Sequence, residues 1–135
     1  MLSNEDVKDS GLLLIRLGIG ASMLIFHGHE KIMGGPELWA KIGGNMQLIG
    51  VPFLPVFWGF MAAFAEVVGS MFVMLGLLFR PATALLAFTM LIAALKHLNL
   101  TSWAFDPDWK GASHALELLI IYFGLFIIGP GRFGV

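Results

Sequence analysis

Four apolar segments, each long enough to cross a lipid bilayer, constrain the fold of this chain more than any other feature. We place them at about residues 11–33, 55–79, 82–98 and 112–128. A helical span needs about 20 mostly apolar residues, so the last two are rather short and their ends are approximate. All four should be α-helices, because lipid offers an open backbone no hydrogen-bond partner. We therefore predict an all-α integral membrane protein, built as one four-helix transmembrane bundle.

Composition agrees with a bilayer environment. The chain has 135 residues, of which 58% are hydrophobic and 13% charged, whereas a soluble domain has roughly 45–50% apolar and 25% charged residues. A chain this short forms one domain, residues 1–135, and shows most of its surface to its solvent. The net charge of −1 gives no indication of a nucleic-acid partner. The absence of cysteine excludes disulfides, thiolate metal sites and covalent c-type haem.

The connection between the first and second spans, residues 34–54, is long enough to carry structure of its own. Its apolar residues recur every three to four positions, at Leu38, Ile42, Met46 and Ile49. That spacing is typical of a short amphipathic helix lying in the membrane interface. An ordered loop agrees with the same residues equally well.

The other two connections differ in character. We expect Arg80 and Pro81 to form a tight turn between the second and third spans, because proline suits the first turn of a helix. Between the third and fourth spans, Trp103 and Trp109 are typical of an interfacial aromatic belt.

Small residues spaced four apart occur in two spans, Gly18 with Ser22 and Ala65 with Gly69. Such pairs let helices approach one another closely. We expect both pairs to pack within the bundle.

An even number of spans places both chain ends on one side of the membrane. The two sides carry equal numbers of basic residues: Lys8, Arg16, Arg80 and Arg132 on the terminal side, and Lys31, Lys41, Lys96 and Lys110 on the opposite, distal side. If Lys31 and Lys96 turn into the bundle, the exposed count favours termini in the cytoplasm. The first nine residues lack the positive region of a signal peptide, so we expect the first apolar segment to be retained as a span.

Ionisable residues inside the spans are the strongest functional signal, because each costs at least ~2.5–3.5 kcal/mol at the bilayer centre. At 1.5 Å per residue, His27 lies roughly 9 Å and Glu66 roughly 16 Å from the distal ends of their helices. His97 closes the third span at that side, and Glu117 lies near the start of the fourth. We predict that His27, Glu66, His97 and Glu117 line a polar pocket in the distal half.

Four further residues are predicted to supply supporting charge: Arg16, Lys31, Lys96 and His114. Lys31 shares a helix face with His27, and His114 shares one with Glu117. Arg16 lies near the other end, where it either reaches the terminal surface or turns inward toward Glu66. Simpler roles stay open: Lys96 reaching the distal surface, His97 as a structural interface residue, and His29 and Glu30 solvating a helix end.

Carboxylates and histidines in a partly buried pocket can bind a ligand and exchange protons. Reduction of a quinone needs this chemistry, because each carbonyl oxygen takes up a proton as electrons arrive. The same residues could bind a polar lipid head group or relay protons. Haem is disfavoured, since His27, His97 and His114 lie at different depths and no spacing motif supports ligation. Those histidines with Glu117 would suit zinc by ligand type alone, and no metal site is predicted.

The ordered set of short motifs resembles the DoxX family of small four-span bacterial membrane proteins, over about residues 13–133. The motifs are LIRLGIG at 14–20, FHGHEKI at 26–32, AEVVGS at 65–70, LGLLFRPA at 75–82, KH at 96–97, Glu117 and GPGRFG at 129–134. The aspartate that often follows the last motif is absent here. The family takes its name from a subunit of an archaeal thiosulfate:quinone oxidoreductase, and related proteins resemble membrane partners of redox enzymes.

The resemblance implies a bacterial inner-membrane protein and raises the expectation of a quinone-linked role. We predict a membrane subunit that binds a quinone or similar lipophilic ligand and works with a partner redox protein, because the chain has no electron carrier of its own. A homo-oligomer is compatible with this role. The rival hypothesis is a non-catalytic scaffold, lipid-binding or transport-accessory protein whose polar groups are structural.

Overall fold

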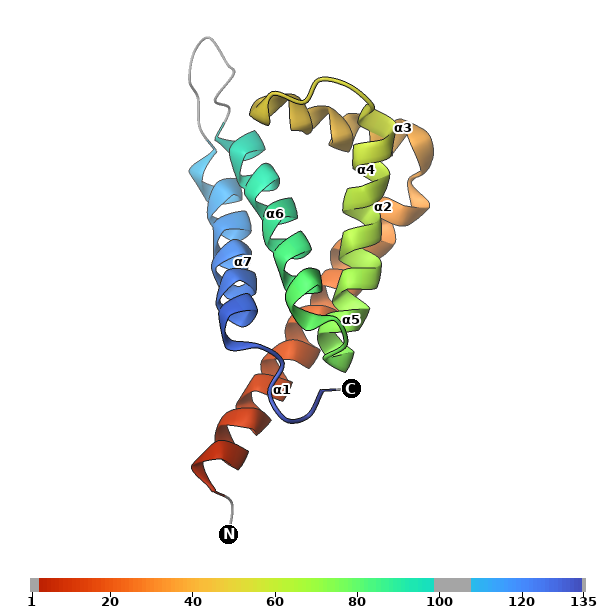
Figure 1. Ribbon diagram of the computed structural model, residues 1–135. Coiled ribbons are helices and arrows are strands. Elements are labelled where there is room, and N and C mark those ends of the chain that lie inside the picture. Colours follow the sequence, from red (N-terminus) through yellow and green to blue (C-terminus); the bar gives the residue numbers. More distant parts are fainter. Residues whose placement is uncertain (1–2, 99–107, 135) are drawn as a thin grey trace.

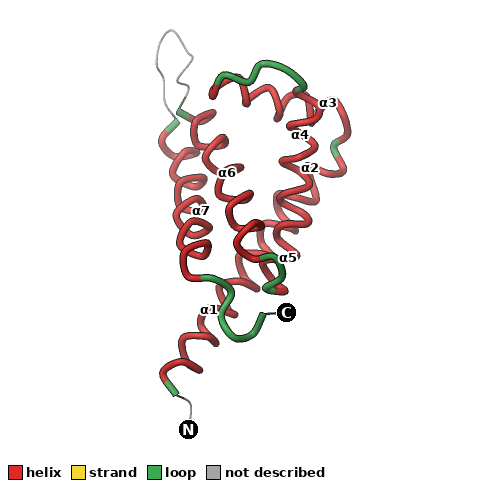
Figure 2. The backbone as a smooth tube through the Cα atoms, viewed as in Figure 1, coloured by secondary structure: helices red, strands yellow, loops and turns green. Residues whose placement is uncertain are grey.

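All regular secondary structure in the described residues, 3–98 and 108–134, is helical in the computed structural model (Figures 1 and 2). Four helices there are long and apolar enough to cross a membrane, which confirms the predicted fold class. Their exposed apolar side chains form the lipid-facing surface of the bundle. The predicted belt residue Trp103 lies outside the described residues.

The first span is a continuous rod of three segments, α1 (Asn4–Met23), the π-helical turn η1 (Leu24–Gly28) and α2 (His29–Met33). It begins at Asn4, seven residues earlier than the apolar pattern predicted. Ser3 and Asp6 cause the extension, because each side chain accepts a hydrogen bond from the other residue's backbone N–H. This capping box stabilises a polar first turn ahead of the membrane segment.

The second span also contains a π-helical turn and runs through α4 (Pro55–Phe64), η3 (Ala65–Gly69) and α5 (Ser70–Leu75). It ends at Gly76, whose left-handed φ of 73° stops the helix. The third span, α6 (Phe79–His97), follows almost at once. The turn between these spans is therefore residues 76–78, and the predicted turn residues Arg80 and Pro81 lie in the first turn of α6, where proline is tolerated.

The fourth span, α7 (Trp109–Ile128), returns to the terminal side and packs along α6 (Figure 1). Asp108 caps its first turn by accepting the backbone N–H of Gly111. The backbone N–H of Asp108 also donates to the carbonyl of His97 at 2.7 Å, which ties the start of α7 to the end of α6.

Of the two alternatives left open for the first connection, the helix is present: α3 (Gly35–Gly43) is continued by the 3-10 turn η2 (Gly44–Ile49). Together they lie across the distal end of the bundle (Figure 2). Helices α3 and α4 touch backbone to backbone, because a side chain on Gly43 would collide with the Pro55 carbonyl, and one on Gly59 with the Trp39 carbonyl. Trp39 Nε1 also donates to the Lys31 carbonyl at 2.8 Å, so α3 is held against both of the first two spans.

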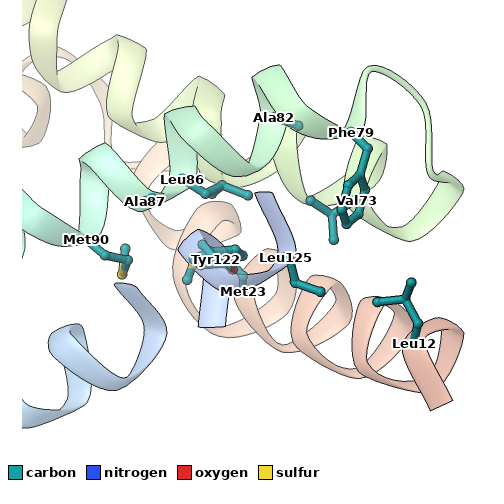
Figure 3. Packing of buried hydrophobic residues seen from close by; sticks show 10 residues of the cluster. All are labelled: Leu12, Met23, Val73, Phe79, Ala82, Leu86, Ala87, Met90, Tyr122 and Leu125. Carbon is teal, nitrogen blue, oxygen red and sulfur yellow. The ribbon is translucent and has the colours of Figure 1, made fainter. Parts of the chain in front are cut away.

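Ten buried apolar residues pack against one another as a single core (Figure 3). All four spans contribute to it, through Leu12, Met23, Val73, Phe79, Ala82, Leu86, Ala87, Met90, Tyr122 and Leu125. Most of these residues lie in the half of the bundle that is nearer the two termini. The distal half can therefore hold polar groups.

Arg16 closes the terminal end of the core. Its side chain is 1% exposed, and it donates hydrogen bonds to four backbone carbonyls: Val73 at 3.0 Å, Met74 at 2.8 Å, Pro130 at 3.1 Å and Phe133 at 3.3 Å. The carbonyls of Val73 and Met74 belong to the last turn of α5, where few helical N–H groups remain, and the Val73 carbonyl also accepts the Gly76 N–H at 3.3 Å. Arg16 therefore follows neither predicted route, to the terminal surface or to Glu66.

Residue exposure corrects two expectations about the bundle surface. Gly18 and Ser22 face outward rather than packing inside, whereas Ala65 and Gly69 are buried as expected. Lys96 stays exposed, so three exposed basic residues lie on each side: Lys8, Arg80 and Arg132 against Lys41, Lys96 and Lys110. The start of α1 and the end of the described chain lie at one end of the bundle (Figure 1), while their cytoplasmic placement stays a prediction.

Candidate functional site

A cavity of about 320 Å³ lies in the distal half of the bundle, beneath α3 and η2. All four spans contribute residues to the cavity wall, and Ile42 of α3 and Met46 of η2 complete it. We call α3 and η2 together the cap of the cavity. Six of the eight residues predicted from the sequence line this one cavity: His27, Lys31, Glu66, Lys96, His97 and His114.

The two π-helical turns place the deepest polar side chains. His27 lies in η1 and Glu66 in η3, and these turns contact each other. A π-turn accommodates one extra residue per turn, is rare in helices and occurs frequently at functional sites. Gly28 makes the contact close, because a Cβ atom there would lie 2.9 Å from the carbonyl carbon of Glu66.

An ion pair between the first and second spans forms the charged part of the wall. Lys31 Nζ lies 2.7 Å from Glu66 Oε1, and the side chains are 25% and 1% exposed respectively. The other carboxylate oxygen, Glu66 Oε2, is buried and has no hydrogen-bond partner among the described residues. A buried polar atom without a partner is unfavourable in a low-dielectric interior, so a hydrogen-bond donor that reached Oε2 would stabilise it.

Two histidines face each other across the cavity wall, because the ring centroids of His27 and His114 are 5.7 Å apart. A third, His97, lies nearer the rim, where its Nδ1 is 3.2 Å from Asp108 Oδ2. The Gly111 backbone N–H, supported by His97, lowers the pKa of Asp108 below its usual value. An ionised Asp108 both caps α7 and orients the His97 ring.

Two of the predicted residues lie outside the cavity. Glu117 is exposed on the outward face of α7, and Arg16 binds the backbone at the terminal end. Sequence position gives the distance of a residue from the end of its helix, but that distance does not determine which face of the helix points inward. His29 and Glu30 are exposed near the distal end of the first span, in line with the solvating role left open for them.

Sequence reasoning missed several lining residues. The most informative is Trp58, because its indole Nε1 is buried without a partner among the described residues. Trp58, Ala62 and Glu66 recur every four residues and form one continuous wall, a spacing that could have been found in the sequence. Four methionines also line the cavity, namely Met23, Met46, Met61 and Met90, and their spacing gives no such signal.

The cavity thus combines adaptable apolar walls with acid, base and hydrogen-bond donor groups. Methionine is flexible and polarisable and adapts to irregular apolar ligands, and the volume lies at the lower end of the ~300–1,000 Å³ range of small-molecule sites. Within residues 3–98 and 108–134, no three His, Asp or Glu side chains come together as a metal site would require. The arrangement is suited to a mainly apolar ligand with a polar head.

These features define a class of protein, a four-span helical membrane protein with a polar cavity inside its bundle. The family model for DoxX matches residues 11–98, and the chain belongs to the DoxX family. The matched region covers the first three spans and the α3 connection, while α7 and the C-terminal motif lie beyond it. No curated protein and no solved structure matches the chain.

Proposed function

We propose that this chain is a membrane subunit of a redox system that binds a quinone, or a similar ring-bearing lipophilic ligand, in the distal cavity. The observation that carries the proposal is the state of Glu66: one carboxylate oxygen is paired with Lys31, and the other is buried at the cavity wall without a partner. A quinol hydroxyl can donate to the free oxygen, and a quinone carbonyl can accept a hydrogen bond from Lys31.

Trp58 offers a second anchor. It lies eight residues before Glu66 on the same wall, roughly 12 Å along the helix, and therefore marks the distal end of the cavity. Its unpartnered indole N–H can donate to an acceptor group on the ligand. The methionine-lined walls between the two residues accommodate the apolar part.

The residues of the cavity can move protons but not electrons. Conversion of a quinone to a quinol takes two electrons and two protons, and Glu66, His27 and His114 are placed to exchange the protons. The chain has no cysteine, so in this proposal the electrons come from a partner oxidoreductase. The same proposal places the protein in the bacterial inner membrane with its termini in the cytoplasm.

Binding of a short-chain quinone to the protein in lipid nanodiscs tests the proposal. We expect decylubiquinone to quench tryptophan fluorescence saturably, and Trp58→Phe to remove most of the saturable component. Glu66→Gln should weaken binding roughly 10-fold or more, the loss of one charge-assisted hydrogen bond. Glu30→Gln is the matched control, an exposed carboxylate at the distal end of the first span that does not line the cavity, and should leave the affinity unchanged.

The redox role has its own measurement. An oxidised-minus-reduced absorbance spectrum of gently purified protein, before and after borohydride, should show a stoichiometric quinone band. If Glu66→Gln lowers the melting temperature but leaves quenching unchanged, Glu66 is structural and the non-catalytic scaffold or lipid-binding role replaces the proposal.

A further inference from the structure

The outward face of α7 carries a regular stripe of exposed or partly exposed residues. Ser113, Glu117, Ile120, Gly124 and Ile127 follow one another at intervals of four, three, four and three. The buried residues of α7, among them Ala115 and Tyr122, lie on the opposite side. Among the four described spans, α7 also buries the smallest share of its apolar segment. Such alternating spacing is the seam along which parallel helices pack left-handedly.

Glu117 is the feature that lipid alone does not explain. It lies eight residues into α7, roughly 12 Å from the start of the helix. It is exposed and makes no hydrogen bond or ion pair with any other described residue. An ionisable group facing hydrocarbon is strongly unfavourable, and such residues face protein or pair with one another almost without exception.

We infer that a second copy of this chain covers the stripe, with α7 packed against α7 in a two-fold symmetric dimer. The charge on the face is self-complementary, because His114 lies three residues before Glu117 and is also exposed. In two parallel copies, Glu117 of each approaches His114 of the other across an axial offset of about 4.5 Å, which side chains span. A two-fold axis makes this acid–base pair twice.

Gly124 provides the room for close approach. A Cβ atom built on it meets nothing within 4 Å, so the glycine is not required by packing inside the chain. Small residues at a helix interface let two membrane helices come together. Gly18 on α1 is equally open but has no acid–base pair of this kind beside it, so it serves as a control.

The dimer would complete the cavity wall of each copy. His114 lines the cavity, and Glu117 of the second copy would border it from outside the bundle. The carboxylate that the sequence placed in the pocket then reaches it from the neighbouring molecule. The dimer itself does not depend on the identity of the ligand.

Oligomeric state in nanodiscs, measured by mass photometry on tagged protein or by native mass spectrometry, tests the inference. We expect a dimer for the unaltered chain and for Gly18→Leu. Gly124→Leu should give monomers with an unchanged helical circular dichroism spectrum, because the monomer has space for the larger side chain. Glu117→Ala should also shift the population toward monomers.

Cross-linking tests the same surface independently. The unaltered chain has no cysteine, so a single introduced cysteine can form a disulfide only with the same cysteine of another copy. Ile120→Cys should form a disulfide dimer in native membranes, whereas Ile25→Cys, at a similarly exposed position on the first span, should not. The inference is overturned if the unaltered chain is monomeric, if Gly18→Leu rather than Gly124→Leu removes the dimer, or if only Ile25→Cys cross-links.

Discussion

Two buried ionisable side chains inside the spans, Arg16 and Glu66, have polar partners of different kinds. Arg16 meets backbone carbonyls from the end of α5 and from the C-terminal segment, where the dipole of a helix end favours a cation. Glu66 is mid-span, far from any helix end, and is neutralised by the side chain of Lys31. The Arg16 side chain is enclosed and bonded to the backbone, whereas the pairing at Glu66 leaves one carboxylate oxygen without a partner among the described residues. Arg16 therefore has a structural role, and in our proposal Glu66 binds the ligand.

Arg16→Lys should lower the free energy of unfolding by about 2 kcal/mol, because an ammonium cannot reach all four carbonyls and its charge stays buried with fewer hydrogen bonds. Arg80→Lys is the control. Arg80 also donates to backbone carbonyls, those of Phe126 and Ile127, but it is exposed, so its replacement should change stability by only about 0.5 kcal/mol. Thermal unfolding of both variants in the same detergent makes the comparison, and equal losses would contradict the assignment.

At the scale of elements, the two π-helical turns η1 and η3 bring His27 of the first span close to Glu66 of the second. Each turn shifts the register of its helix locally, and the pair η1 and η3 meet where His27 and Glu66 are located. Gly28 allows the contact, and the cap formed by α3 and η2 depends in the same way on Gly43 and Gly59. Close backbone approach at these glycines thus positions both the floor and the roof of the cavity.

Gly28→Ala should destabilise the bundle by about 1–3 kcal/mol, the usual result of overpacking, because the new methyl group would lie 2.9–3.0 Å from the backbone of Glu66. It should also weaken quinone binding by displacing Lys31 from Glu66. Gly11→Ala is the matched control in the same span, since its Cβ meets nothing within 4 Å. There the better helix propensity of alanine should leave stability unchanged or raise it by up to ~1 kcal/mol. Melting temperature and quinone quenching measure both effects.

The whole molecule divides along the membrane normal into two parts. Apolar packing and the arginines Arg16, Arg80 and Arg132 hold the terminal half together, and the distal half encloses the cavity under its helical cap. The core on one side keeps the spans in place, so the other side can tolerate a hollow interior. Met23 and Met90 join the two parts, because they belong to the apolar core and also line the cavity.

Topology follows from this arrangement and can be measured in intact cells. Single cysteines at Ser3 and Gly134 should react alike with a membrane-impermeant maleimide, and Lys41→Cys in the cap should react oppositely. For termini in the cytoplasm, Ser3→Cys and Gly134→Cys label only after permeabilisation, whereas Lys41→Cys labels directly. Labelling of Ser3→Cys and Gly134→Cys from opposite sides would contradict the four-span fold, and the reverse pattern would place the termini outside.

The amino-acid sequence by itself determined the class of this protein. In apolar segments near the length of a bilayer, only a helix satisfies the backbone hydrogen bonds, so the four spans followed directly. For the connection between the first two spans the sequence left a helix and an ordered loop equally open. The distance of each polar residue from the end of its span also follows from the sequence, because the rise per residue of a helix is constant. That is why six of the eight selected polar residues meet in one cavity.

The tertiary structure decided which way the helices face and what meets each polar group. In a span that is apolar all round, periodicity does not distinguish a side facing lipid from a side facing protein, so Glu117 was assigned inward although it faces outward. The partners of Arg16 are backbone carbonyls in segments more than fifty residues away, which no side-chain pattern indicates. The π-turns and the glycine contacts likewise depend on packing between spans, and this packing brings Lys31, Glu66 and the two histidines into one cavity.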